Sequence, residues 1–171
     1  MLKMGTRREE RRWIASGAAI FVALIVDLVS KHAAEVALAR GRQIPLFAGD
    51  LTLRLLFNKG ASSGVGSSVP LLVSILVVFG TTALIIWSFR SPLKWLRLSL
   101  GLAAGGSLGN LADRIFRPPG LFRGAVIDWI SLFHENIVFN LADVFIRIGI
   151  VVAVLVLIFD RSLWSRDRTR L

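Results

Sequence analysis

The 171-residue sequence contains no cysteine and only two histidines, His32 and His134. Without thiols the chain cannot form a disulfide framework, an iron–sulfur or cysteine-rich zinc site, or a cysteine nucleophile of its own. The histidines lie in different predicted loops and no His-Glu-x-x-His pattern occurs, which leaves little basis for a zinc site. We therefore expect chemistry that uses no metal and no cofactor.

Acidic residues are also scarce, with 11 Asp and Glu against 21 Lys and Arg and a formal net charge of +10. A chain this basic attracts polyanions, so nucleic acid is one partner to consider. However, hydrophobic residues make up 54% of the sequence without glycine, above the about 45–50% that soluble domains reach with glycine included. The length predicts a single domain over residues 1–171, and the composition predicts a membrane protein.

Long apolar runs predict four transmembrane helices, and the fold class is therefore an all-α membrane protein. The third run is short: the 15 charge-free residues Leu98–Ala112 would rise about 22 Å against a core of ~30 Å, so its charged end must lie at the interface. For the first run a cleaved signal peptide is the alternative, but Asp27 within it favours a retained helix. The predicted spans cover approximately residues 13–30, 69–89, 95–115 and 139–159.

The distribution of Lys and Arg predicts how these helices cross the membrane. The two tails and the short connection between the second and third spans contain 12 of these residues, whereas the long loops 31–68 and 116–138 contain seven. By the positive-inside rule, both termini then face the cytoplasm and both loops face outward. The basic charge is thus a topology signal, and we expect no nucleic-acid partner. In the first loop, Ile44–Phe47 and Leu51–Phe57 flank Gly49-Asp50, which predicts a small extracytoplasmic β-hairpin.

Four aspartates are predicted to lie at the outer face. Asp27, Asp113 and Asp143 stand near the outer ends of three spans, and Asp128 lies in the second loop, fifteen residues from each of Asp113 and Asp143. Ionisable groups at membrane depth cost roughly 2.5–3.5 kcal/mol and therefore often serve function. Asp128 has no partner at helical spacing. For the others a structural explanation is local pairing, of Asp27 with Lys31, Asp143 with Arg147, and Asp113 with neighbouring Arg114 or others.

Two carboxylates held close together cannot easily both ionise, so one keeps its proton while the other stays charged. Such a pair supplies an acid and a base in one site, which can activate water and protonate a peptide carbonyl. A small proton-coupled transporter is the rival explanation, but transporters tend to bind near the midplane and to have repeated halves, whereas these acids gather at one end. Ser62 and Ser63, with Lys59 as the one evident base, stay open as nucleophiles.

Amides and glycines accompany the acids. Asn58, Asn110 and Asn140 each lie near a carboxylate in sequence or predicted depth, where they either orient the site or serve the fold. The third span has a glycine every fourth residue from Gly101 to Gly109. Such a stripe of small residues predicts that another helix packs closely against this span.

Five short motifs occur in one order along the predicted spans and loops. With four spans in this topology, they resemble lipoprotein signal peptidase, the bacterial type II signal peptidase, over nearly the whole chain. The motifs are Asp27-Leu28-Val29-Ser30-Lys31, Asn58-Lys59-Gly60-Ala61, Gly105-Gly106-Ser107-Leu108-Gly109-Asn110-Leu111-Ala112-Asp113-Arg114, Val126-Ile127-Asp128-Trp129-Ile130 and Phe139-Asn140-Leu141-Ala142-Asp143.

The resemblance implies an aspartic endopeptidase of the bacterial cytoplasmic membrane, with its active site at the outer face. The implied substrate is a diacylglyceryl-modified prolipoprotein, cleaved just before the lipidated cysteine, with Asp128 and Asp143 as the catalytic pair. A β-cradle built from the first outer loop, membrane lipid as a partner and inhibition by the cyclic peptide globomycin are implied too, and we expect a monomer. Eight further residues match positions that support the site or bind substrate: Asp27, Lys31, Asn58, Gly60, Asn110, Asp113, Arg114 and Asn140.

Two features depart from the family pattern. Ser62 and Ser63 precede Gly64, where the family commonly has a small residue followed by an aromatic one. Arg147 follows Asp143 by one helical turn. If it reaches Asp143 it favours the ionised form, which would make Asp143 the base and Asp128 the protonated partner.

Overall fold

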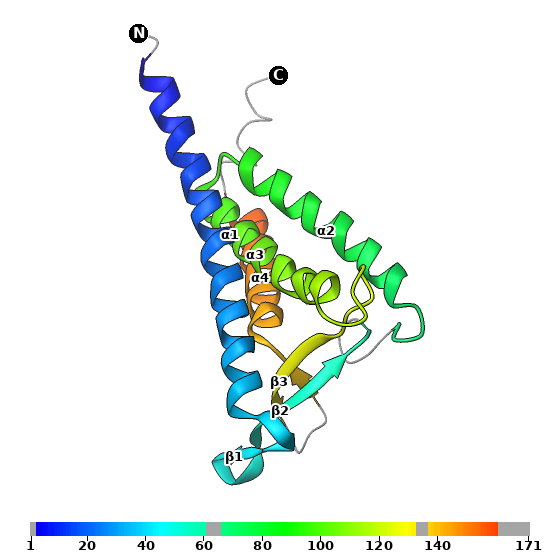
Figure 1. Cartoon of the computed structure of the whole chain (residues 1–171). Coiled ribbons are helices and arrows are strands. Elements are labelled where there is room, and N and C mark those ends of the chain that lie inside the picture. Colours follow the sequence, from blue (N-terminus) through cyan, green and yellow to red (C-terminus); the bar gives the residue numbers. More distant parts are fainter. Residues whose placement is uncertain (1–2, 61–65, 133–136, 161–171) are drawn as a thin grey trace.

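The computed structural model describes residues 3–60, 66–132 and 137–160. Four helices form a bundle, and a four-stranded sheet lies at one end of it (Figure 1). The amino end of α1 and the carboxyl end of α4 lie at the opposite end of the bundle. The helices are α1 (Lys3–Ala37), α2 (Pro70–Arg90), α3 (Lys94–Phe116) and α4 (Leu141–Phe159), and the strands are β1 (Ile44–Leu46), β2 (Leu51–Asn58), β3 (Val126–Leu132) and β4 (Ile137–Phe139).

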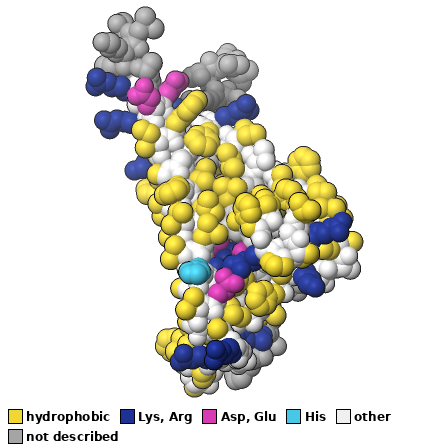
Figure 2. Space-filling model, in the orientation of Figure 1, with side chains coloured by type: hydrophobic (Ala, Val, Ile, Leu, Met, Phe, Trp, Pro, Cys, Tyr) yellow, Lys and Arg dark blue, Asp and Glu magenta, His cyan; other side chains and the backbone are white. Residues whose placement is uncertain are grey.

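Three of the helices are long and apolar enough to cross a membrane: Glu9–Ala37 within α1, α2 and α4. Their outer faces expose large apolar side chains such as Phe21, Leu76 and Val151. Figure 2 shows hydrophobic side chains over the middle of the molecule and charged side chains gathered toward its two ends. This distribution matches helices surrounded by lipid, and it confirms the first, second and fourth predicted spans.

The predicted third span forms α3, but α3 is not among the helices with the hydropathy of a membrane span. It lies in the centre, in contact with α1, α2 and α4, and 13 of its 23 residues are buried, whereas α2 buries three. A helix enclosed by its neighbours needs no apolar outer face. The expectation of four apolar spans is thus confirmed for the outer helices, while α3 supplies the protein-covered core.

Small residues bring the helices close to α3, as the glycine stripe predicts. A Cβ on Gly105 would lie 2.6 Å from the Cβ of Ala23 on α1, and one on Gly106 would lie 2.6 Å from the carbonyl oxygen of Ala142 on α4. A Cβ on Gly109 would collide with the Asp27 carboxylate. Only glycine at these positions lets α1 and α4 approach α3 this closely, and the approach sets the depth of the aspartates.

The strands form one antiparallel sheet in the order β1-β2-β3-β4. The predicted hairpin is present, with Ile44 opposite Leu53 and Leu46 opposite Leu51. Strand β3 pairs with β2 so that Leu56 lies opposite Asp128.

Two features of the predicted outer loops were not anticipated. The second outer loop, residues 116–138, contains β3 and the start of β4. Strand β3 pairs with β2, which is distant in sequence, and β4 pairs with β3. Helix α1 continues past residue 30 to Ala37, so Lys31 and His32 lie on a helix rather than in the first loop. With 35 residues, α1 is about 52 Å long, more than the ~30 Å core requires.

Candidate active site

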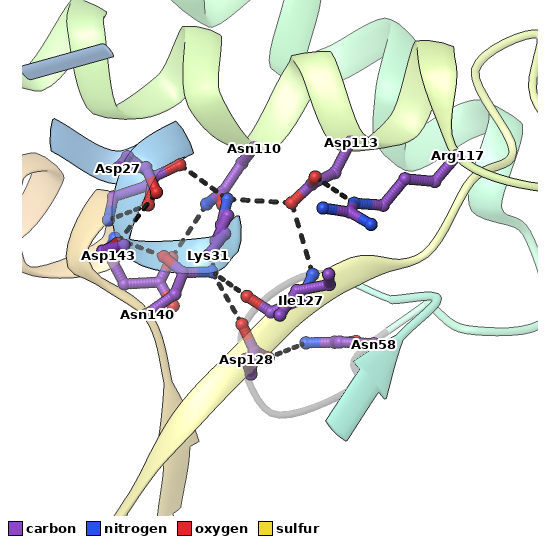
Figure 3. Close-up of polar contacts among 12 residues, drawn as sticks. Asp27, Lys31, Asn58, Asn110, Asp113, Arg117, Ile127, Asp128, Asn140 and Asp143 are labelled. Atoms are coloured by element: carbon purple, nitrogen blue, oxygen red, sulfur yellow. Dashed lines mark hydrogen bonds and ion pairs between the residues drawn. The ribbon is translucent and has the colours of Figure 1, made fainter. Parts of the chain in front are cut away.

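A buried ammonium group lies between two carboxylates at the sheet end of the bundle (Figure 3). Lys31 Nζ is 2.7 Å from Asp27 Oδ2 on the same helix and 2.9 Å from Asp113 Oδ2 on α3. It also donates a hydrogen bond of 2.9 Å to Asn110 Oδ1. Lys31 and Asp27 are fully buried, so each charge depends on the others for compensation. The predicted Asp27–Lys31 pair is confirmed, and the cluster fixes α1 to α3.

The prediction named Arg114 or other residues as partners of Asp113, and the structure shows other residues in this role. The Asp113 carboxylate binds Lys31, the Nε of Arg117 and the backbone N–H of Ile127, and Arg117 also makes two hydrogen bonds of 2.7 and 3.0 Å to Glu35. Arg117 stands four residues after Asp113 and so lies on the same helical face, whereas the adjacent Arg114 does not. Arg117 was missed, although the spacing that indicates Asp27–Lys31 would also have found it.

Arg114 instead contacts the segment after β2. Its guanidinium donates to the carbonyl oxygen of Gly60 and, at 3.5 Å, to that of Lys59. The backbone N–H of Gly60 in turn donates to Asn58 Oδ1 at 2.9 Å. Arg114 thereby fixes the end of β2 against α3, beside Asp128.

Three asparagine amides orient the remaining two aspartates (Figure 3). Asn58 Nδ2 donates to Asp128 Oδ2 at 3.0 Å, and Asn140 Nδ2 lies 2.7 Å from Asp128 Oδ1. Asn110 Nδ2 donates to Asp143 Oδ1 at 3.0 Å. Asn140 also caps α4, because its Oδ1 accepts from the backbone N–H of Asp143 at 3.0 Å.

The asparagines also link the two halves of the site. Asn140 Nδ2 is 3.0 Å from Asn110 Oδ1, the same atom that accepts from Lys31. The backbone N–H of Ala142 donates to Asp27 Oδ1 at 2.9 Å. The first turn of α4 is therefore held by both the ion cluster and the amides, so the position of Asp143 depends on α1 and α3 as well as on its own helix.

Asp128 and Asp143 line one cavity of about 240 Å³. Of the other predicted residues, Asn58, Gly60, Asn110 and Arg114 line it too, whereas Asp27, Lys31 and Asp113 are not among its lining residues and reach it through Asn110. Three further lining residues were not among the predicted site residues. Val77 and Ile146 contribute apolar side chains to the wall, and Ser107 contributes a hydroxyl group. The cavity thus contains two carboxylates and several amide donors. Arg114 and Arg147 also line it, but among the described residues neither carboxylate makes an ion pair.

Asp128 lies on β3, is only 2% exposed and is open to the cavity. Burial raises the pKa of Asp128 to about 6, against the hydrogen bonds from Asn58 and Asn140 and with a further upward contribution from the charge of Asp143. Asp143, at the start of α4, is only half-buried. Asp128 is therefore able to take up a proton near neutral pH.

The predicted Asp143–Arg147 pair was wrong. Among the residues that the structure describes, no ion pair joins these two side chains. The Arg147 guanidinium lies 5.8 Å from the ring centroid of Phe139, at the rim of the cavity. The aromatic ring at the end of β4 therefore attracts the cation away from the carboxylate one turn earlier.

The histidines and serines considered in the sequence analysis lie away from this cavity or outside the described residues. His32 is exposed on α1, and His134, Ser62 and Ser63 lie outside the described residues. Within residues 3–60, 66–132 and 137–160, no group of three His, Cys, Asp or Glu side chains has the arrangement of a metal site.

Comparisons with known sequences all identify the same family. Residues 19–159 match the family model for signal peptidase (SPase) II. A lipoprotein signal peptidase of Bifidobacterium adolescentis is 33% identical over 167 residues, covering 97% of this chain and 88% of the relative. A lipoprotein signal peptidase of Streptomyces griseus is 38% identical over 140 residues, covering 80% and 69%, respectively.

Comparison with solved structures gives the same fold. A structure described as a bacterial membrane enzyme, obtained by the in meso method at 2.3 Å resolution, aligns with a TM-score of 0.72. The alignment covers 86% of this chain and 89% of that one, at 23% sequence identity.

Proposed function

Because the chain belongs to the signal peptidase II family of aspartic peptidases, membrane proteins that cleave lipoprotein signal peptides, we propose that Asp128 and Asp143 are its catalytic pair. The substrate is a diacylglyceryl-modified prolipoprotein, cut just before the lipidated cysteine. The observation that carries this proposal is the single cavity lined by both carboxylates, each held by an asparagine amide.

Asp143 acts as the base and Asp128 as the acid. Asp143 is half-buried, lines the cavity and receives one hydrogen bond from Asn110, so its carboxylate can meet the attacking water there. Burial keeps Asp128 ready to hold a proton, with its pKa raised to about 6.

Hydrolysis follows from this division of roles. Asp143 removes a proton from water, the hydroxide adds to the scissile carbonyl carbon, and the proton of Asp128 passes to the carbonyl oxygen. The tetrahedral species then collapses: its C–N bond breaks, the proton on Asp143 passes to the leaving nitrogen, and a hydroxyl proton returns to Asp128. The products are the free carboxyl end of the signal peptide and the amine of the lipidated cysteine.

The neighbouring residues position the pair and the substrate. Lys31, Asp27 and Asp113 hold Asn110, which in turn orients Asp143. Arg114 and the Gly60 segment form the wall along which the substrate backbone binds.

The site lies at the outer face of the cytoplasmic membrane, and both termini face the cytoplasm. Support comes from the excess of Lys and Arg in the tails and the 90–97 connection, and from the position of the sheet at the other end of the bundle. A substrate anchored by two acyl chains presents its scissile bond near the interface, the depth at which α4 begins. The protein works as a monomer without a cofactor, and globomycin blocks it.

The test is cleavage of a diacylglyceryl prolipoprotein by the purified protein in detergent, followed as the mobility shift on loss of the signal peptide. Asp128→Asn and Asp143→Asn should each lower kcat by about 10³-fold or more, the upper range of acid–base catalysis. Asp160→Asn, at the far end of α4 from the site, is the matched control and should cleave normally. Normal cleavage by either active-site variant would remove that residue from the pair.

A further inference from the structure

A second cavity lies between α1 and α2 near the amino end of α1, remote from the sheet. Its volume is about 490 Å³, and it shares no lining residue with the cavity of Asp128 and Asp143. The rings of Trp13 and Phe89 meet edge to face across the two helices, with centroids 6.3 Å apart. The lining residues are Glu9, Arg12, Trp13, Ile85, Ile86, Phe89, Arg90 and Ser91.

Positive charge is in excess at this cavity. Arg12 and Arg90 line it, and Arg97 of α3 stands behind its wall, donating a hydrogen bond of 3.4 Å to the carbonyl oxygen of Ser91. Arg97 is 7% exposed, its buried Nε has no hydrogen-bond partner within the described residues, and its charge is close enough to repel that of Arg12. No ion pair between described residues includes any of these three arginines. Glu9 is the single acidic residue of the lining.

Buried serines fix the helices around this charge. Ser16 Oγ of α1 donates to the carbonyl oxygen of Ser88 at 3.2 Å, and Ser88 Oγ donates to that of Arg97 at 2.9 Å. These bonds join α1, α2 and α3 directly beside the cavity, and both serines are fully buried. The arginines are therefore held together by the fold, although their charges repel.

The surroundings identify the kind of anion that fits. Arg90 is the last residue of a membrane-spanning helix, so the cavity opens at the membrane surface. Trp13 and Ile86 line it, and they are 65% and 45% exposed, so the cavity adjoins accessible apolar surface. Guanidinium groups bind phosphate oxygens through paired hydrogen bonds. In a molecule that carries both a phosphate and acyl chains, the phosphate can bind the arginines while the acyl chains contact this apolar surface.

We propose that this cavity binds the headgroup of an anionic phospholipid, with the phosphodiester between Arg12 and Arg90 and the acyl chains along α1 and α2. An uncompensated phosphate balances the excess positive charge, whereas a zwitterionic headgroup brings a cation of its own. The site is independent of the proposed peptidase activity, because it shares no residue with the catalytic cavity.

The test is native mass spectrometry of the purified full chain with phosphatidylglycerol, phosphatidylcholine or inorganic phosphate. Phosphatidylglycerol should be retained at least about fivefold more tightly than phosphatidylcholine, and Arg12→Gln and Arg90→Gln should each weaken its binding by about fivefold. The control is Arg11→Gln, which removes the same charge from the adjacent, exposed position outside the cavity and should change binding by less than about twofold. Glu9→Gln, which removes the one lining carboxylate, should strengthen binding.

Equal retention of the two lipids would overturn the proposal, and so would equal losses in Arg11→Gln and Arg12→Gln. Inorganic phosphate bound as tightly as phosphatidylglycerol would assign the cavity to a soluble anion instead. The gain expected for Glu9→Gln keeps the test decisive even if an arginine variant folds poorly, since unchanged or weaker binding there contradicts the charge argument.

Discussion

The four aspartates at the sheet end fall into two pairs with different partners. Asp27 and Asp113 share the ammonium group of Lys31, whereas Asp128 and Asp143 receive hydrogen bonds from neutral amides. A buried cation holds a carboxylate in its ionised form, because releasing the pair would leave an uncompensated charge. An amide orients a carboxylate but adds no charge, so its protonation can still change. The first pair therefore fixes the helices around the site, and the second has the surroundings that the proposed proton transfer needs.

Removal of the shared cation should have the largest effect on stability. Lys31→Met leaves the buried Asp27 without a cationic partner and leaves Asp113 with Arg117 alone, and we expect the free energy of unfolding to fall by about 3–5 kcal/mol. Unfolding in detergent by denaturant measures this loss. Lys94→Met, an exposed lysine at the other end of the bundle, should unfold like the wild type. Equal stability of the two variants would show that the cluster is not structural.

Loss of an orienting amide should affect catalysis more than folding. Asn140→Leu removes the donor to Asp128 and the cap of α4. We expect kcat to fall by about 10–100-fold, from the lost hydrogen bond to an ionisable group, and the free energy of unfolding to fall by only about 1 kcal/mol. Cleavage kinetics and denaturant unfolding on the same preparation separate the two effects. A loss of stability as large as that of Lys31→Met would erase the contrast between the pairs.

The pH dependence of stability and of kcat/KM should reveal the protonation of Asp128. Since the pKa of Asp128 is raised from 3.8 to about 6 in the folded protein, its contribution to stability is complete below pH 3.8 and is lost as the pH rises through about 6. The proposed mechanism uses the same proton, so we expect kcat/KM to decline above about pH 6. Asn58→Leu removes a hydrogen bond that favours the charged form and should move this decline to higher pH. A shift to lower pH would contradict the role assigned to Asp128.

The smallest effect is expected at Arg147. Its guanidinium lies over Phe139 and makes no ion pair with Asp143, so Arg147→Met should change kcat by less than about twofold. The cleavage assay measures this directly. A loss comparable to that of Asn140→Leu would indicate that Arg147 acts on Asp143 during turnover.

The sequence allowed good prediction wherever the physics is local. Apolar runs gave the outer helices, turn residues gave the β1–β2 hairpin, and a spacing of four residues gave the Asp27–Lys31 pair. The same spacing was a poor guide for Asp143 and Arg147, because it cannot show that the aromatic ring of Phe139 competes for the cation. Helical spacing shows which side chains can meet, and the tertiary surroundings decide which of them do.

Long-range features could not be predicted in this way. The pairing of β3 with β2 depends on segments about 70 residues apart, and the position of Asp128 depends on that pairing. The ammonium of Lys31 reaches Asp113 only because small residues let α1 approach α3. The stripe from Gly101 to Gly109 indicated a close neighbour but not which helix it was.

The central claim is that Asp128 holds a proton that Asp143 does not. Infrared difference spectroscopy of the purified protein, titrated from about pH 5 to about pH 7, reports this proton through the C=O stretch of a protonated carboxyl group. We expect this band to be lost on raising the pH, to be absent in Asp128→Asn and to persist in Asp143→Asn. A band that persists in Asp128→Asn and disappears in Asp143→Asn would contradict it.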